Sequence, residues 1–247
     1  MRKGNRSFAA AFLIAAFVPW HAGAEPAPAS ERHLVYDFTY GTSSDLEIHD
    51  SGMGGSGNAG SGSTDSGASD QDKGTITVDV IGERPDGGLT IMVSEAAQGH
   101  RTALPAACVV YDNTTTVCDL GKRVNEEELA IARLLGPHFF DPSRVDAKQH
   151  WNVTNSSNGF SERSDFSVSK NDGGMLTIAE SGTATQSGMP KIDTSVSATI
   201  RYDSNLQVPV NVSEYSVARE QQSIDQHETQ TSQMSASLVS DSMAKKN

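Results

Sequence analysis

The stretch Asn125–Leu135, NEEELAIARLL, predicts the one helix in the chain with both a clear start and a clear end. Asn125 can accept a hydrogen bond from the first turn, and Glu128 can reach back to the Asn125 N–H, which makes a capping box. Gly136 can take the left-handed conformation that ends many helices. A helix of about three turns is unstable alone, so its apolar face must pack against another element.

The apolar residues of this helix and of the turn after it are the candidate lining of a ligand cavity. Ile131, Leu134 and Leu135 follow the helical spacing i, i+3, i+4. Phe139 and Phe140 come shortly after them. The helix is either a lid over a cavity or a plug in the core of a sheet. We favour the plug, because every amphipathic helix needs a packing partner and few helices are lids.

Alternating apolar and polar residues on both sides of the helix predict about ten β-strands. His33–Tyr40 is one of them. Residues 75–81 and 89–93 read as a hairpin around the turn Arg84–Gly88, and Asn171–Gly174 marks another hairpin turn. Short turns between successive strands predict an antiparallel meander.

The region around residues 208–217 shows a change of phase. Val208, Val210 and Val212 alternate, and the apolar positions then shift to Tyr215 and Val217. A shift of one residue in a period of two predicts a β-bulge near Ser213–Glu214.

The predicted fold class is therefore mainly β, with one short helix between two groups of strands. The antiparallel meander should form a curved half-barrel or a sandwich, because a sheet of this size tends to curl or split. In strand order and in its single central helix, the region 31–219 resembles the exported bacterial half-barrel carriers of lipids and lipoproteins. This resemblance implies a lipid or another apolar small molecule as ligand. No sequence motif of that family is matched, so no functional residue is carried over.

Residues 1–24 are predicted to be a signal peptide. Arg2, Lys3 and Arg6 precede the uncharged apolar run Phe8–Val18, which is too short to span a bilayer as a helix. Ala22–Ala24 fits a small-residue cleavage site. No second apolar stretch of spanning length follows, so we expect an exported, periplasmic or extracellular protein without a transmembrane segment after cleavage.

Composition divides the rest of the chain. Residues 25–32 read as a linker, and 33–219 as a single β-rich domain interrupted by a Gly/Ser-rich, disordered loop at 51–73. Residues 220–247 are rich in Gln, Ser, Thr and charge and read as a disordered tail. A helix around Met234–Met243 is the alternative for part of this tail.

Cys108 and Cys118 are the only cysteines. In an exported chain, two cysteines most simply form one disulfide, here across a symmetric hairpin that also pairs Val109 with Val117. In the chain-entropy model, closing so short a loop contributes roughly 3 kcal/mol to stability. The spacing does not match C-x-x-C or a zinc site, which argues against a redox or metal pair.

The charge balance limits the partners. The chain carries a net charge of −12, and removal of three basic residues with the signal peptide makes it −12 − 3 = −15. Such a chain is repelled by phosphate backbones and anionic membrane surfaces, so no nucleic-acid partner is expected. An apolar small molecule or an envelope protein remains as a partner class.

No catalytic signature is present in the sequence. The G-x-S-x-G, H-E-x-x-H and phosphate-loop patterns do not occur, and we predict no catalytic, metal-binding or cofactor-binding residue and no cofactor. Three functions stay open. The protein is an exported, non-catalytic binding protein with an apolar or amphipathic ligand in a β concavity, an envelope or surface interaction module, or a hydrolase without a recognisable motif.

Overall fold

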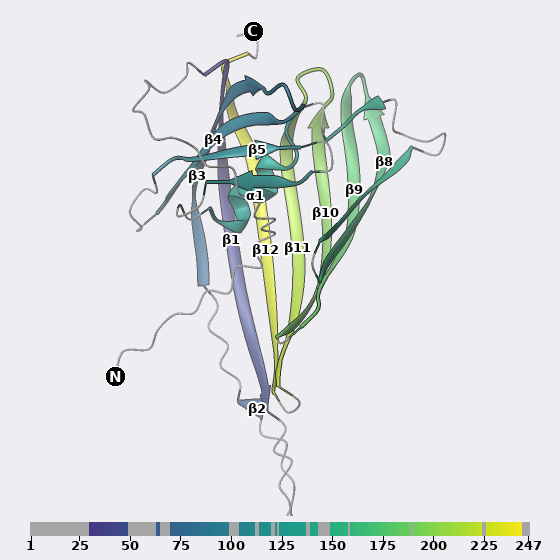
Figure 1. Cartoon of the computed structure of the whole chain (residues 1–247). Helices are drawn as coiled ribbons and strands as arrows, with labels where there is room; N and C mark the ends of the chain where they lie inside the picture. The colour runs from purple at the N-terminus through teal and green to yellow at the C-terminus, as the bar shows by residue number, and fades with distance from the viewer. Residues whose placement is uncertain are drawn as a thin grey trace, which may run out of the picture.

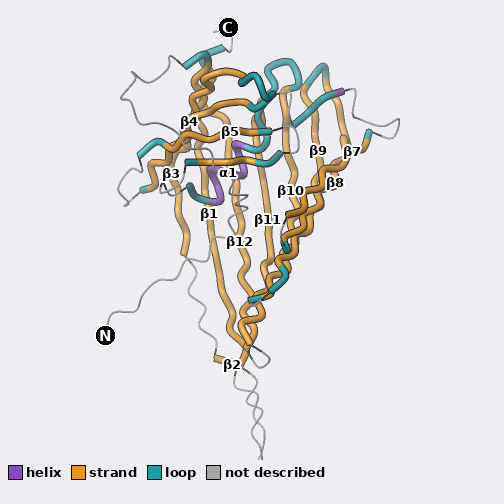
Figure 2. Tube along the Cα trace, in the orientation of Figure 1, coloured by secondary structure: helices purple, strands orange, loops and turns teal. Residues whose placement is uncertain are grey.

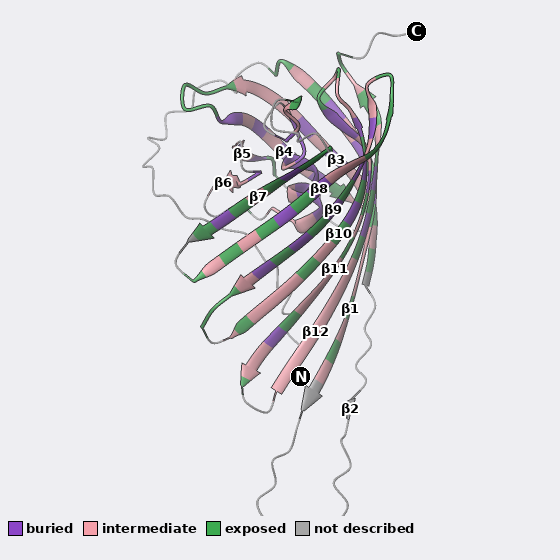
Figure 3. Ribbon diagram, turned by 90° about the vertical axis from the view of Figure 1, so that its right-hand side faces the viewer, coloured by how far each residue is buried: buried purple, intermediate pink, exposed green. Residues whose placement is uncertain are grey.

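The computed structural model of the protein describes residues 30–48, 63–64, 70–98, 104–111, 114–119, 122, 124–136, 139–142, 149–157, 159–188, 190–223 and 226–243. These residues form one continuous antiparallel sheet and one short helix (Figures 1 and 2). The mainly β, antiparallel fold class is confirmed, and the sheet is open and curved, not a sandwich of two sheets (Figure 3). The predicted signal peptide lies outside the described residues.

Twelve strands and one helix follow in chain order. They are β1 (Arg32–Ile48), β2 (Ser63–Thr64), β3 (Asp70–Glu83), β4 (Leu89–Ala97), β5 (Ala106–Val110), β6 (Thr116–Cys118), α1 (Glu126–Ala132), β7 (His150–Ser157), β8 (Phe160–Asp172), β9 (Met175–Gln186), β10 (Lys191–Asp203), β11 (Val208–Ser223) and β12 (Gln226–Asp241).

The sheet joins two meanders through the first and last strands. Its order is β6-β5-β4-β3-β1-β12-β11-β10-β9-β8-β7, and the two-residue β2 pairs with β1. The order therefore ends at β6 on one side and β7 on the other, and α1 lies in the segment that connects these two strands along the chain. Figure 1 shows α1 on the concave side of the sheet. We call the face toward α1 the inner face and the opposite one the outer face.

The helix begins where the sequence predicts and ends earlier. Asn125 is the N-cap and Glu128 completes the capping box. After Ala132 the chain tightens, since the Leu134 N–H donates to the Ile131 carbonyl at 3.1 Å, a spacing of three residues instead of four. Gly136 has a φ of 72°, the left-handed conformation that the sequence predicts there.

The predicted hairpins and the disulfide are confirmed. The turns at Arg84–Gly88 and Asn171–Gly174 join β3 to β4 and β8 to β9. Cys108 and Cys118 are bonded and face each other across β5 and β6, with Val109 opposite Val117. These elements depend on neighbouring residues only, which is why the sequence predicts them well.

The prediction of a disordered tail from residue 220 is wrong. Glu220–Ser223 complete β11, and Gln226–Asp241 form β12, which pairs with β11 on one side and β1 on the other. Met234, where the alternative helix would begin, lies in this strand and is buried on the inner face. The segment is polar because only its second half faces the apolar core. Its first half lies where the inner face is polar.

Two further predicted boundaries are corrected. Asp70–Lys73, assigned to the Gly/Ser-rich loop, belong to β3, where Gln71 pairs with Gly41 of β1. Ser63–Thr64 of the same loop pair with β1 as β2, and the other residues of 51–69 lie outside the described residues. The predicted linker 25–32 extends one residue too far, because β1 already starts at Arg32.

The predicted bulge is misplaced. The register between β10 and β11 shifts between Arg201 and Tyr202, opposite Val210. Ser213–Glu214 pair regularly with β10. The prediction rests on Tyr215, but this residue lies on the outer face and is 43% exposed. Its position in the sequence pattern therefore does not indicate a bulge.

The hydrophobic core lies between α1 and one end of the sheet. Both meanders contribute to it: Leu34, Tyr36, Ile76, Val78, Ile91, Ile178 and Ile200 are all fully buried. The ring of Phe139 completes this core, with centroids 5.1–5.9 Å from those of Trp151, Phe166 and Tyr202. The core thus fixes α1 and the turn after it against the inner face.

The central position of β12 in the sheet predicts that Gln226–Asp241 is essential for folding. Ending the chain after Ser223 removes the strand that both β1 and β11 pair with, so we expect loss of the cooperative thermal transition and of the β signal in circular dichroism. Ending the chain after Met243 is the matched control and should leave the transition in place. A cooperative transition in the shorter variant would contradict this topology.

Candidate functional site

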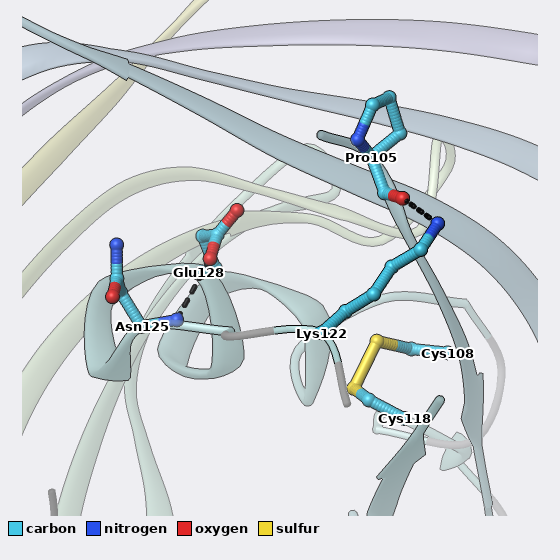
Figure 4. The surroundings of a disulfide bond; sticks show 6 residues. All are labelled: Pro105, Cys108, Cys118, Lys122, Asn125 and Glu128. Atoms are coloured by element: carbon cyan, nitrogen blue, oxygen red, sulfur yellow. Dashed lines mark hydrogen bonds between the residues drawn. A yellow bond between two sulfur atoms is a disulfide. The ribbon is translucent and has the colours of Figure 1, made fainter. Parts of the chain in front are cut away.

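The first turn of α1 is tied to β4. The Asn125 N–H donates to Glu128 Oε2 at 2.7 Å, as the capping box requires (Figure 4). Asn125 Nδ2 donates to Glu95 Oε2 at 2.8 Å, and Glu95 is a buried residue of β4. The Cys108–Cys118 disulfide lies close to this turn in the same view. The cap therefore fixes both the start of the helix and its position on the sheet.

Three buried carboxyl groups lie at the contact between the first turn of α1 and β4. Glu95, Glu127 and Glu128 are each at most 7% exposed. Burial raises the pKa of Glu127 to about 8, and the nearby charge of Glu95 adds to the shift. Burial and the same neighbour raise the pKa of Glu128 to about 7. Near neutral pH the cluster therefore holds protons that the same residues would release in water.

The C-terminal end of α1 is held by a buried ionic cluster. Arg133 donates to both oxygens of Glu180 at 2.7 and 2.8 Å and to Glu214 Oε2 at 2.8 Å. The Glu180 side chain is 1% exposed, and Ser164 Oγ also donates to it at 3.1 Å. Burial alone would lower the pKa of Arg133, but the two carboxylates raise it above its ordinary value. The guanidinium thus stays charged and ties the helix to β9 and β11.

A single row of paired residues marks the limit of the helix on the sheet. The row crosses the inner face through Tyr40, Met234, Glu214, Ala198 and Glu180, and we call it the boundary row. At its β1 end, the Tyr40 hydroxyl donates to Glu126 Oε2 of α1 at 2.7 Å. Both ends of the helix therefore contact the sheet through this row.

The five residues predicted to line a cavity come together in the fold. Ile131, Leu134, Leu135 and Phe139 are at most 3% exposed and belong to the hydrophobic core, and Phe140 packs partly buried against it. In this position they anchor the helix to the sheet, which supports the plug role. Their role as ligand contacts stays a prediction.

The inner face continues well beyond the boundary row. Strands β1, β11 and β12 have 17, 16 and 16 residues and are about 50–55 Å long, whereas the seven residues of α1 extend about 10 Å. In Figures 1 and 2, α1 lies toward one end of the strands, which run on past it. We call the inner-face positions beyond the boundary row on β8 to β12 and β1 the floor. They are every second residue of six segments, counted from the first residue of each: Phe160–Ser164, Gly182–Gln186, Ile192–Val196, Ser216–Glu220, Glu228–Ser232 and Thr42–Leu46.

The floor is amphipathic. Its apolar side chains are Leu46, Phe160, Ala184, Ile192, Val196 and Ala218, and most of its other side chains are hydroxyls and amides. None of these apolar side chains is exposed, although the helix ends before reaching them. Small side chains dominate the middle of the surface, which leaves room for another group to approach the backbone.

The charges of the floor all have one sign. Glu162, Glu220 and Glu228 are its only charged residues. The strand Lys and Arg residues around it alternate onto the outer face: Lys73, Arg163, Lys191, Arg201 and Arg219. Sequence reasoning missed the floor because it assigned Glu220 and Glu228 to a disordered tail.

The outer face carries a separate hollow of about 470 Å³ over β10, β11, β12 and β1. Its lining includes many hydroxyl and amide side chains: Thr39, Ser197, Thr199, Ser213, Gln233 and Ser235. Apolar ligands are held by predominantly apolar walls. This hollow therefore does not fit the apolar ligand that the resemblance implies.

Other chemistry is sparse in the described part of the chain. His33 Nδ1 lies 2.7 Å from Asp79 Oδ1, but the two side chains are 51% and 35% exposed. Within the described ranges, no three His, Cys, Asp or Glu side chains are placed to hold a metal ion, and no helix is long and apolar enough to cross a membrane.

Comparisons with protein-family models, with curated proteins and with solved structures found no match.

The ionic cluster predicts a large effect of Arg133. Arg133→Met leaves the buried carboxylate of Glu180 without a cation, so the free energy of unfolding should fall by about 3–5 kcal/mol. Arg163→Met is the matched control, since Arg163 and Asp165 are 59% and 50% exposed and such pairs contribute at most about 1 kcal/mol. Urea unfolding measures both, and equal losses would contradict a role for burial.

The carboxyl cluster predicts a stability that falls with rising pH. Because folding raises the pKa of Glu127 from 4.5 to about 8, the folded state binds the proton more tightly. The contribution is complete below pH 4.5 and is lost as the pH rises toward 8. Glu127→Gln should therefore flatten the dependence of the melting temperature on pH between 5 and 8.5, whereas the exposed Glu83→Gln should not. Parallel curves for wild type and Glu127→Gln would contradict the assignment.

Proposed function

We propose that this chain is an exported, non-catalytic binding protein that holds an amphipathic ligand against the floor of its curved sheet. One observation carries the proposal: the inner face extends past α1 as an amphipathic surface, with Phe160, Ile192 and Leu46 among polar and small side chains. A surface of this composition suits a ligand that has both apolar and polar parts.

The disulfide supports the export part of the proposal. Disulfides such as Cys108–Cys118 form and persist in oxidising compartments, outside the cytosol. The expected signal peptide points in the same direction. In a periplasmic or extracellular compartment, a carrier would keep sparingly soluble amphiphiles in solution.

The arrangement of helix and sheet supports a carrier. The sheet is curved and open, with one helix on its concave side, and a concave sheet offers a surface on which a ligand can be held. In this chain α1 fills only one end of that concavity, since its contacts stop at the boundary row. The inner surface beyond the boundary row is the part that we assign to a ligand.

Binding of single-chain amphiphiles tests the proposal. We expect isothermal titration calorimetry to show direct binding of at least one of dodecylammonium, dodecylphosphocholine and dodecanoate. Ala218→Trp fills the middle of the floor and should weaken binding about tenfold or more, which corresponds to about 1.4 kcal/mol. Val217→Trp, the neighbouring position on the outer face, is the matched control and should bind like the wild type.

Two results would overturn the proposal. One is a folded wild type that binds none of the three amphiphiles and no amphipathic peptide. The other is Ala218→Trp with unchanged affinity, because the ligand would then lie elsewhere. Thermal unfolding of both variants confirms that the comparison concerns folded proteins.

A further inference from the structure

The helix α1 shows how this inner face receives a helix. Its apolar residues Ile131 and Leu134 are fully buried in the core, and Arg133 pairs with both Glu180 and Glu214 at the boundary row. The part of the inner face that binds α1 is therefore an apolar surface bordered by carboxylates. The helix that covers it is amphipathic and places a cation next to these carboxylates.

The floor repeats this arrangement without a cation. Glu220 and Glu228 lie directly opposite each other on β11 and β12. Glu220 is 9% exposed, and Gln222 Nε2 donates to Glu228 Oε2 at 3.1 Å. Like charges in opposite positions of a sheet destabilise it, and burial makes the effect larger. Burial and the charge of Glu228 together raise the pKa of Glu220.

Apolar side chains stand on both sides of this pair. The cross-strand neighbour of Glu220 on β10 is Ile192, and that of Glu228 on β1 is Leu46. Ala218 lies two residues away on the same face and offers no bulk. The carboxylates are thus placed between apolar contacts, as a single cationic side chain on an apolar helix face would require.

The dimensions fit a helix better than a single acyl chain. The floor crosses six strands, β8 to β12 and β1, which is about 24 Å at the usual strand spacing. It is three inner-face rows deep, or about 13 Å between the first and the last row. A helix about 10 Å in diameter and about 16 residues long covers such an area.

We propose that the floor is the docking surface for a basic amphipathic helix of a partner protein, whose Lys or Arg side chains pair with Glu220 and Glu228 between apolar contacts to Ile192 and Leu46. This inference rests on the proposed function and names its ligand. Charge complementarity indicates that the partner helix is basic, because the floor carries carboxylates and no cation, in a chain with a net charge of −12. An anionic amphiphile would meet repulsion there.

Two synthetic helices of about 16 residues test the inference. They share one Leu-rich face and the same neutral polar face, and they differ only in two residues set among the Leu side chains, which are Lys in one peptide and Glu in the other. Fluorescence anisotropy with the full chain should show binding of the basic peptide, weaker binding at higher salt, and at least about tenfold weaker binding of the acidic peptide.

The double variant Glu220→Gln/Glu228→Gln should lose about tenfold in affinity for the basic peptide and most of the salt dependence. The matched control, Glu31→Gln/Glu83→Gln, changes the net charge equally at exposed positions away from the floor and should bind like the wild type. Ala218→Trp blocks the surface without a change of charge and should also weaken binding.

The outcomes separate the two claims. Equal affinity for the acidic and basic peptides, or unchanged binding by the Glu220→Gln/Glu228→Gln variant, overturns the inference and leaves the proposed function standing. Absence of binding to both peptides and to the single-chain amphiphiles overturns both. Equal weakening by the Glu31→Gln/Glu83→Gln control shows that only net charge acts and also overturns the inference.

Discussion

The pairing of the first strand with the last is the interaction on which the rest of the structure depends. β1 and β12 run side by side from Leu34–Asp241 to Ile48–Gln226, and Arg32 Nε donates to Asp241 Oδ1 at 3.0 Å beside one end of the ladder. This pairing joins two meanders, each built from local hairpins, into one sheet. It closes a loop of almost the whole chain, at an entropic cost that grows only slowly with loop length.

The same pairing explains why α1 lies where it does. Once β1 and β12 meet in the middle, the connected strands β6 and β7 become the two ends of the sheet order. The helix α1 lies in the chain between them, on the concave side of the sheet (Figure 1). Its contacts then span both meanders, since Asn125 reaches β4 and Arg133 reaches β9 and β11.

The sequence predicts the parts of this architecture whose causes are local. Asn125, Glu128 and Gly136 define the helix through bonds within a few residues, and Cys108 with Cys118 defines its hairpin in the same way. The cluster of Arg133 with Glu180 and Glu214 joins residues 47 and 81 positions apart, so no sequence pattern reveals it. The bulge at Val210 is likewise set by pairing with β10, which the phase of β11 alone does not report.

The largest error of sequence reasoning and the proposed binding surface have one physical origin. The sequence of β12 reads as a tail because its first half places Glu228, Gln230 and Ser232 inward, where a strand beneath a hydrophobic core would place apolar residues. Its second half places Met234 and Ala236 inward, under α1, and both are buried. Sequences break the rules of strand patterning mainly where a surface serves something other than folding. The first half of β12, with its polar residues on the inner face, is such a break. On the neighbouring strand β11, Glu220 lies on the same face directly opposite Glu228. The composition that hides this strand in the sequence is therefore the feature that marks the floor as a place for a partner.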